Sequence, residues 1–436
     1  MSFDALHPHA QRIAIIGSGI SGLAAAWQLA PHNRVTIYEA ETRLGGHSRT
    51  ITAGRNGDQP VDTGFIVFNY ANYPHLTRLF SELDVPVEKS DMSFGVTIDQ
   101  GRIEYALRDL NSLVAQKRNL ARPGFLRMVA DIAKFNAKAV AVAQSDDVTI
   151  DDLLDALNLG DWFRRYYLLP ICGAIWSTPA DQIGAFPAKS LLRFFENHAL
   201  LSATGQHQWW TVSGGSIEYV KRLEAALRLR GVEFRTGTPV TAIERQRNSV
   251  TISAEKALPD QFDQVIIATH SDQALKLLAK PSPQEQAALS AVRYQPNDVY
   301  LHRDVAQMPR RRACWSSWVY QAQTRANETR LGVTYWMNKL QNIPESDPLF
   351  VTLNPDTPIA EETIYDHEVF WHPVFDRAAI QAQCEIQSIQ GLNRTWFAGA
   401  WLRHGFHEDG FASAVRVARE LNRGAQPQVD FEKVPA

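Results

Sequence analysis

Cysteine is scarce in this chain. Its 3 cysteines, Cys172, Cys314 and Cys384, lie far apart among 436 residues and form no CxxC pair. This number and spacing exclude a disulfide-stapled scaffold, a zinc ribbon and a CxxC redox pair. They favour a reducing, cytoplasmic compartment.

Long apolar runs are also absent, since no stretch reaches the roughly 18 apolar residues that a membrane-spanning helix needs. Residues 1–11 are polar and lack the basic and apolar regions of a secretory signal. We therefore expect a cytoplasmic protein that is soluble or, at most, peripheral to a membrane.

Charge of one sign does not accumulate either. The 44 Lys and Arg residues and 47 Asp and Glu residues give a net charge of -3, which leaves no electrostatic footprint for a nucleic-acid partner. With 45% hydrophobic and 21% charged residues, the composition is that of a folded globular protein. The length predicts two domains, or one large domain with an insertion.

Short buried strands are present at the start, middle and end of the chain. Apolar runs over 12–16 and 34–38 enclose an alanine-rich helix over 21–30, which is a βαβ beginning. Similar runs recur at 264–269 and 395–398, and a helix follows from about 410 to 423. Between them the pattern predicts helices over 107–142, interrupted at Pro123-Gly124, and over 150–201, then an aromatic, strand-like region over 299–369. This predicts a discontinuous Rossmann-like α/β domain with an inserted α+β domain.

A glycine-rich loop links the first strand to the first helix. In Gly17-Ser-Gly19-Ile-Ser-Gly22 the first glycine permits a tight turn, the second lets backbone approach a pyrophosphate, and the third lets helix and strand pack closely. The diphosphate would lie at the helix N-terminus, where N–H groups and the dipole favour anions. Glu39, at the end of the second strand, is placed to bind ribose hydroxyls and argues against a 2′-phosphate. The loop predicts a dinucleotide site.

Further glycines decide which dinucleotide. Arg43-Leu-Gly45-Gly46-His47 suits a second pass of backbone around the same diphosphate, and Asp62-Thr63-Gly64-Phe65 adds another loop. Near the end, Ala398-Gly399-Ala400 closes a strand, and the segment 405–414 opens a helix whose N-terminus suits the electron-rich end of a reduced flavin. Together they favour FAD.

With these motifs the chain resembles the flavin-containing amine oxidase superfamily, which includes monoamine oxidases, protoporphyrinogen oxidases and phytoene desaturases. The segments 397–401, 405–410 and 335–338 more closely resemble bacterial predicted NAD/FAD-binding flavoproteins of that superfamily, which are associated with cyclopropane-type fatty-acyl modification. Two positions depart from the superfamily pattern: Ala400 stands where an acid is common, and His47 where arginine is frequent.

The resemblance implies a Rossmann-like FAD-binding domain over 1–75, 211–275 and 391–436, and a substrate domain over 76–210 and 276–390. The FAD would be non-covalent, because no histidine or cysteine is clearly placed for a covalent link. The residues expected to contact it are Gly17, Ser18, Gly19, Ile20, Ser21, Gly22, Glu39, Ala40, Arg43, Gly45, Gly46, His47, Thr63, Gly64, Phe65, Val240, Thr269, Gly399, Ala400, Phe406, His407, Glu408, Gly410 and Phe411.

The chemistry follows from what accompanies the flavin. A second GxGxxG and a CxxC are both missing, so the substrate itself must reduce the flavin. Hydride transfer to flavin N5 calls for a base, and the candidates are His407, Tyr335 and Lys339, the last two expected on one face of a strand. A metal site is not expected, because the histidines show no ligand spacing.

Many aromatic residues outside the glycine motifs suggest an apolar substrate, which predicts an oxidoreductase that oxidises or desaturates a fatty-acyl chain. These aromatics are Phe68, Tyr70, Tyr73, Trp176, Trp315, Trp318, Tyr335 and Trp336. The alternatives are an amine oxidase producing hydrogen peroxide, a double-bond isomerase, and a non-catalytic flavoprotein partner of a lipid methyltransferase. The basic stretch from Arg108 to Lys138 is either a solvated helix face or a surface that meets anionic phospholipid.

Overall fold

The computed structural model describes residues 10–143, 145, 147–176, 183–197, 207–325 and 328–425. Its centre is a parallel sheet of five strands in the order β10-β2-β1-β14-β20. The strands are β1 (Arg12–Ile16), β2 (Arg34–Tyr38), β10 (Glu233–Arg235), β14 (Gln264–Ile267) and β20 (Thr395–Phe397). They come from distant parts of the chain, as the scattered apolar runs predict.

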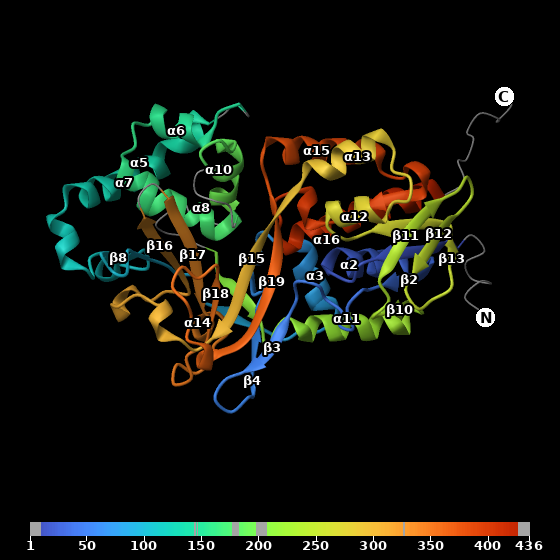
Figure 1. Ribbon diagram of the computed structural model, residues 1–436, viewed down its shortest axis with the longest axis horizontal. Coiled ribbons are helices and arrows are strands. Elements are labelled where there is room, and N and C mark those ends of the chain that lie inside the picture. The colour runs from blue at the N-terminus through green and yellow to red at the C-terminus, as the bar shows by residue number, and fades with distance from the viewer. Residues whose placement is uncertain are drawn as a thin grey trace, which may run out of the picture.

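Both faces of this sheet are covered, because alternate residues of each strand point to opposite sides. Ile13 and Ile15 pack with helices α2 (Ile20–Leu29), α11 (Ile217–Leu229) and α16 (His407–Ala425). Ala14 and Ile16 pack on the other face with α12, α13 and α15. Those three helices span Ser271–Leu277, Pro283–Ala291 and Arg377–Ile389, and Figure 1 shows them together above the sheet.

A second sheet has seven strands in the order β19-β15-β18-β17-β16-β7-β8. It is antiparallel except for the parallel pair β16 and β7. The strands are β7 (Phe94–Ile98), β8 (Ile103–Ala106), β15 (Arg293–His302), β16 (Trp318–Arg325), β17 (Glu328–Trp336), β18 (Phe350–Leu353) and β19 (Ile364–Val374). The long pair β15 and β19 runs from this sheet back toward the parallel sheet (Figure 1).

Helices cover the far side of the second sheet and form their own apolar core with it. They are α4 (Leu110–Leu113), η1 (Lys117–Ala121), α5 (Pro123–Val142), α6 (Ile150–Ala156), α7 (Asp161–Phe163), the π-helical η2 (Arg164–Leu168), α8 (Leu169–Trp176) and α10 (Ala188–Asn197). Among the described helices, none is long and apolar enough to cross a membrane.

Smaller elements complete the fold. Strands β11 (Val240–Arg245), β12 (Val250–Ala254) and β13 (Asp260–Phe262) form one antiparallel sheet, β3 (Thr50–Ala53) pairs with β4 (Gln59–Asp62), and β9 (Trp209–Val212) joins β5 (Val67–Phe68) to β6 (Val87–Ser90). The remaining helices are α3 (Pro74–Glu82), η3 (Val305–Gln307), η4 (Arg312–Cys314), α14 (Met337–Leu340), η5 (Glu361–Thr363), η6 (Leu392–Arg394) and η7 (Ala400–Leu402).

The α/β fold class is confirmed. The five parallel strands all fall within the segments predicted to bind FAD, and the seven strands of the second sheet within the predicted substrate segments; the division into two domains stays a prediction. The helical stretch expected over 107–142, with its interruption at Pro123-Gly124, is found as α4, η1 and α5, and α5 begins at Pro123. Proline suits the first turn of a helix, where its missing N–H costs nothing. Parts of the helix expected over 150–201 lie outside the described residues.

Candidate active site

The glycine-rich loop is shaped by close backbone contacts. A Cβ added at Gly22 would lie 1.9 Å from the Gly17 carbonyl oxygen, so helix α2 can approach its strand only with glycine there. Gly17 has a positive φ of 99°. At Gly19 the opposite holds, because an added Cβ would meet nothing within 4 Å. The space in front of Gly19 is open, as a phosphate cradle requires.

The N-terminus of α2 is itself suited to an anion. Gly19 is the N-cap and offers no side-chain hydrogen bond, and the first turn carries no acidic residue. The first N–H groups of the helix and its dipole are therefore not neutralised by a carboxylate of that turn.

Glu39 holds the loop together. Its carboxylate accepts hydrogen bonds from the Ser18 amide (2.8 Å) and the Ser18 hydroxyl (2.6 Å). Its other oxygen accepts from the amide of Glu41 at 2.9 Å. Glu39, the residue predicted to bind the ribose, thus lies at the edge of the cradle, and three donors fix the direction of its carboxylate.

The second glycine segment lies over the first. The Gly45 amide donates to the Ser18 carbonyl at 3.1 Å, and a Cβ added at Gly46 would lie 3.1 Å from Gly19 Cα. The Arg43 guanidinium donates to the Gly46 carbonyl at 2.8 Å. This is the predicted second pass of backbone beside the same cradle.

The loop 62–65 and the final helix close the site. A Cβ added at Gly64 would lie 2.0 Å from the His47 carbonyl oxygen, and one at Gly410 would lie 2.8 Å from the Ser21 hydroxyl. The Gly399 amide donates to Ser413 in α16 at 2.9 Å. The beginnings of α2 and α16 therefore meet, with Gly46 packed on Gly19 and Phe65 stacked on His407.

These residues fit FAD. The open space at Gly19, the uncapped start of α2 and the acid at Glu39 suit a diphosphate and a ribose, and the start of α16 suits the flavin end. Of the other candidates, Ala40 follows Glu39, Thr63 donates from its amide to the Arg49 carbonyl at 2.9 Å, Val240 begins β11, and the Thr269 carbonyl accepts from Trp401 Nε1 at 3.1 Å.

His407 is the first residue of α16, which begins three residues earlier than predicted. Its ring stacks on Phe65 with centroids 4.0 Å apart, and Nε2 lies 2.6 Å from the Tyr219 hydroxyl and 3.2 Å from the Ser48 hydroxyl. Burial lowers the pKa of His407 to about 3, so the ring is neutral and a weak base at neutral pH. Its catalytic role stays a prediction.

The expected pairing of Tyr335 and Lys339 on one strand was wrong. Strand β17 ends at Trp336, and Lys339 lies in α14. The Lys339 ammonium pairs with Glu345 at 2.7 Å and lies 5.4 Å from the Trp336 ring centroid. Its half-exposed position does not bring it to Tyr335, which is half-buried against both large apolar cores.

Two other candidates use their side chains elsewhere. The Glu408 carboxylate accepts from the amides of His75 (2.9 Å) and Leu76 (3.1 Å) at the start of α3, and burial raises the pKa of Glu408 to about 7. The Phe411 ring stacks on His75 with centroids 5.8 Å apart. Both side chains therefore join α16 to α3.

A buried acid anchors the loop before Gly64. Asp62 is fully buried and accepts hydrogen bonds from Thr50 (2.6 Å), from the amide and hydroxyl of Ser216, and from Gln341 (3.0 Å). Burial raises the pKa of Asp62 to about 6, although these donors oppose the shift. Its part in the motif is to hold the loop.

Sequence reasoning missed a group of histidines. His47 lies about 6 Å from both His270 (6.1 Å) and His372 (5.9 Å) between ring centroids, and 4.9 Å from Phe370. Burial lowers the pKa of His47, and proximity to His372 and His270 lowers it further. Burial also lowers the pKa values of His270 and His372, so the three rings are neutral. In the part of the chain that the structure describes, no cluster of His, Cys, Asp or Glu is placed to hold a metal ion. Because these three histidines lie far apart in the sequence, no local sequence pattern could predict that they meet.

Comparison with known proteins agrees with this geometry. The family model of flavin containing amine oxidoreductases matches residues 20–302, which is more than half of the chain. The chain belongs to the flavin-containing amine oxidoreductase family. It is an enzyme, a flavin-dependent oxidoreductase whose cofactor is FAD.

Curated relatives match over parts of their length. A polyamine oxidase from Oryza sativa is 27% identical over 273 residues, which is 58% of this chain and 50% of the relative. A mitochondrial protoporphyrinogen oxidase from Nicotiana tabacum is 49% identical over 47 residues, which is 11% of this chain and 9% of the relative.

Solved structures share the fold over nearly the whole chain. A CLA-producing fatty acid isomerase from P. acnes is 16% identical with a TM-score of 0.67, covering 96% of this chain and 99% of that one. A redesigned putrescine oxidase is 16% identical with a TM-score of 0.69, covering 95% and 99%. These identities show a common fold.

Proposed function

We propose that this flavoenzyme oxidises or desaturates a fatty-acyl chain. The observation that carries the proposal is a group of five half-buried aromatic side chains that pack against one apolar core and include Phe406 from the loop before α16, which we call the aromatic wall. It consists of Phe94, Trp318, Tyr335, Phe375 and Phe406.

The aromatic wall begins at the flavin loop itself. A Cβ added at Gly405 would lie 3.0 Å from the Phe375 ring, so the loop that carries Phe406 packs directly on the wall. Trp318 and Tyr335 meet edge to face with centroids 4.9 Å apart. Burial raises the pKa of Tyr335, so its hydroxyl is neutral. The wall therefore offers a substrate apolar contact and no charge.

An acyl chain suits such a wall better than an amine. Amine oxidation is favoured by an aromatic pair flanking the amine, and here only Phe406 comes from the flavin loop. Lys339, the lysine that the sequence suggested as a catalytic base, pairs with Glu345 rather than lying at the candidate flavin site. The fold shared with a fatty acid isomerase is consistent with an acyl substrate.

In this proposal the glycine loops and the start of α2 bind the diphosphate, Glu39 binds the ribose, and the start of α16 orients the flavin ring. Bound FAD supplies the acceptor for a hydride. The aromatic wall aligns the acyl chain and excludes water, and neutral His407 keeps Tyr219 and Ser48 in place.

The decisive experiment is anaerobic mixing of the purified flavoprotein with oleoyl phospholipid or oleate. Bleaching of the flavin, together with a lipid product lighter by two hydrogens in mass spectrometry, is expected. A product of unchanged mass with a shifted double bond would assign the isomerase instead. Bleaching by amines only, with peroxide on readmitting oxygen, would assign the amine oxidase and overturn the acyl proposal.

We propose further that the enzyme takes its substrate from an anionic membrane. On η1 and α5, the exposed cations Lys117, Arg127 and Lys138 accompany the exposed side chains of Leu120 and Leu126. Leucines between cations are typical of surfaces that lie on anionic lipid. The neighbouring Arg118 and Arg122 serve the fold as well, since they donate to the carbonyl of Arg102 at 2.7 and 3.0 Å.

Liposome sedimentation tests this docking. Wild type should sediment with anionic vesicles at low salt and much less at high salt, because each cation near the surface adds about 1 kcal/mol that salt screens. Replacing Lys117, Arg127 and Lys138 with glutamate should remove binding while the flavin spectrum stays unchanged. Wild type that ignores anionic vesicles at low salt would refute membrane docking and leave the acyl chemistry to be judged separately.

A further inference from the structure

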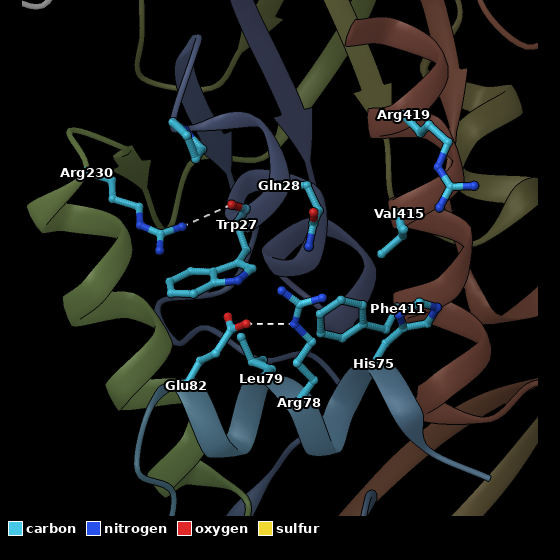
Figure 2. Close-up of a pocket in the computed structure, with 11 residues that line it drawn as sticks. Trp27, Gln28, His75, Arg78, Leu79, Glu82, Arg230, Phe411, Val415 and Arg419 are labelled. Carbon is cyan, nitrogen blue, oxygen red and sulfur yellow. Dashed lines mark hydrogen bonds and ion pairs between the residues drawn. The ribbon is translucent and has the colours of Figure 1, made fainter. Parts of the chain in front are cut away.

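A pocket of about 400 Å³ lies where helices α2, α3 and α16 meet, with Arg230 reaching in from the end of α11 (Figure 2). It is separate from the phosphate cradle. Trp27 follows Ile20 by seven residues along α2, which places it roughly 10 Å farther along the helix axis. The acyl proposal does not use this pocket. Its volume is in the range of small-molecule sites.

The pocket is aromatic on two sides. Trp27 from α2 and Phe411 from α16 both line it, and in Figure 2 the Arg78 side chain of α3 rises between them. The Arg230 guanidinium lies 3.4 Å from the Trp27 ring centroid and donates to the Trp27 carbonyl at 3.1 Å. A flat apolar group would find ring surfaces here and a cation already stacked on one of them.

The charge around the pocket is positive. Arg78, Arg230 and Arg419 line it against one carboxylate, Glu82, which pairs with Arg78 at 2.8 Å. Among the described residues, neither Arg230 nor Arg419 forms an ion pair. Three guanidinium groups thus face one carboxylate, and Glu82, which is paired with Arg78, is also the charge that attracts Arg230.

The pKa of His75, which also lines the pocket, reflects the same positive charge. Burial lowers the pKa of His75, and the cations Arg419, Arg78 and Arg416 lower it further. A guanidinium presents a planar fork of donors that matches carboxylate and phosphate groups. The excess positive charge and the aromatic rings therefore suit one ligand that has both an anionic group and a flat apolar ring.

We propose that this pocket binds a small organic anion that joins a flat apolar group to a carboxylate or phosphate, with Trp27 and Phe411 contacting the ring and Arg230 and Arg419 the anion. The site is tied to the flavin end of α16, because Glu408, three residues before Phe411, holds the start of α3 through the amides of His75 and Leu76.

Calorimetric titration of the flavin-loaded enzyme tests the proposal with 1-naphthyl phosphate and 1-naphthoate as probes. These two arms distinguish a phosphate from a carboxylate ligand. Uncharged 1-naphthol and inorganic phosphate, each with half of the required features, should bind at least about tenfold more weakly, because each lacks either the charged hydrogen bonds or the ring contacts.

Arg419→Gln should weaken the better probe about tenfold or more, the loss expected for one charge-assisted hydrogen bond. Arg423→Gln is the matched control: it removes the same charge from an exposed position of the same helix outside the pocket, and binding should change less than threefold. An unchanged flavin spectrum and melting temperature verify that both variants are folded. Absence of saturable binding by either probe to wild type, equal binding of 1-naphthol, or equal losses in the two variants would each overturn the proposal.

Discussion

The two sides of the candidate active site are built in different ways. On the flavin side, five glycines hold backbone against backbone, and added Cβ atoms at Gly22 and Gly64 would lie within 2.0 Å of a carbonyl oxygen. On the substrate side, the aromatic wall is made of side chains from β7, β16, β17 and the loops at 375 and 406. The flavin side therefore depends on positions that carry no side chain. The substrate side depends on positions that carry large aromatic side chains.

The buried acidic groups are also divided unequally between the flavin side and the aromatic wall. Asp62 and Glu408 lie on the flavin side, both fixed by backbone amides and both with raised pKa values. The aromatic wall carries only the neutral hydroxyl of Tyr335. A polar cofactor and an apolar chain would therefore meet at a boundary that runs through the loop at Phe406.

The largest effect is expected from two glycine substitutions in one loop. Gly22→Val should destabilise the fold, because its Cβ would overlap the Gly17 carbonyl at 1.9 Å. Gly19→Val should leave the apoprotein fold intact but abolish flavin binding, because the open space there is the proposed diphosphate site. Flavin absorbance and apoprotein melting temperature measure the two effects separately. Flavin retained by Gly19→Val would refute the cradle.

Next in size is the pH dependence produced by Glu408. Its pKa is about 7 in the folded enzyme and about 4.5 when unfolded, so the folded state binds more protons between these values. Stability should therefore fall as pH rises from about 4.5 to 7, by up to roughly 3 kcal/mol. Glu408→Gln should flatten this part of the curve, measured by urea unfolding at pH 5 and 8.

The exposed Glu420, on the same helix, provides the control as Glu420→Gln. A curve for Glu408→Gln that keeps the full wild-type slope would show that the buried carboxylate does not titrate as described. Asp62, with its own raised pKa of about 6, accounts for a residual slope.

Glu39→Ala should weaken FAD binding by about 1.5–3 kcal/mol, the scale of a hydrogen bond to a charged group. It also removes the acceptor for the Ser18 and Glu41 amides. Equilibrium dialysis against apoprotein gives the affinity, with Glu255→Ala, at an exposed position after β12, as the control. Flavin held as tightly as in wild type would remove Glu39 from the site.

The smallest effect tests the aromatic wall. Trp318→Ala should lower kcat/KM for the acyl substrate about tenfold, because lost apolar contact is worth on the order of 1–3 kcal/mol. Trp371→Ala removes a half-exposed tryptophan of β19 outside the wall and should have little effect. Equal kcat/KM values for the two variants would place the acyl chain elsewhere.

The same division explains what the sequence could predict. Glycine loops, buried strands and the acid after β2 leave local patterns, because backbone approach and burial act on neighbouring residues. The aromatic wall and the histidine group at 47, 270 and 372 leave none, because their members meet only when the sheets form. Lys339 was misplaced for a local reason: β17 ends at Trp336, and the next turn is helical.

The strand order of the parallel sheet has a consequence for biosynthesis. Strand β14 ends at residue 267, but its neighbour β20 starts at 395, and α16, which packs on α2, starts at 407. At about 5–20 residues per second, a ribosome leaves that edge and helix face uncovered for on the order of ten seconds. The nascent chain therefore cannot complete its cofactor site early, and during that interval the open edge of β14 is free to pair wrongly with another strand.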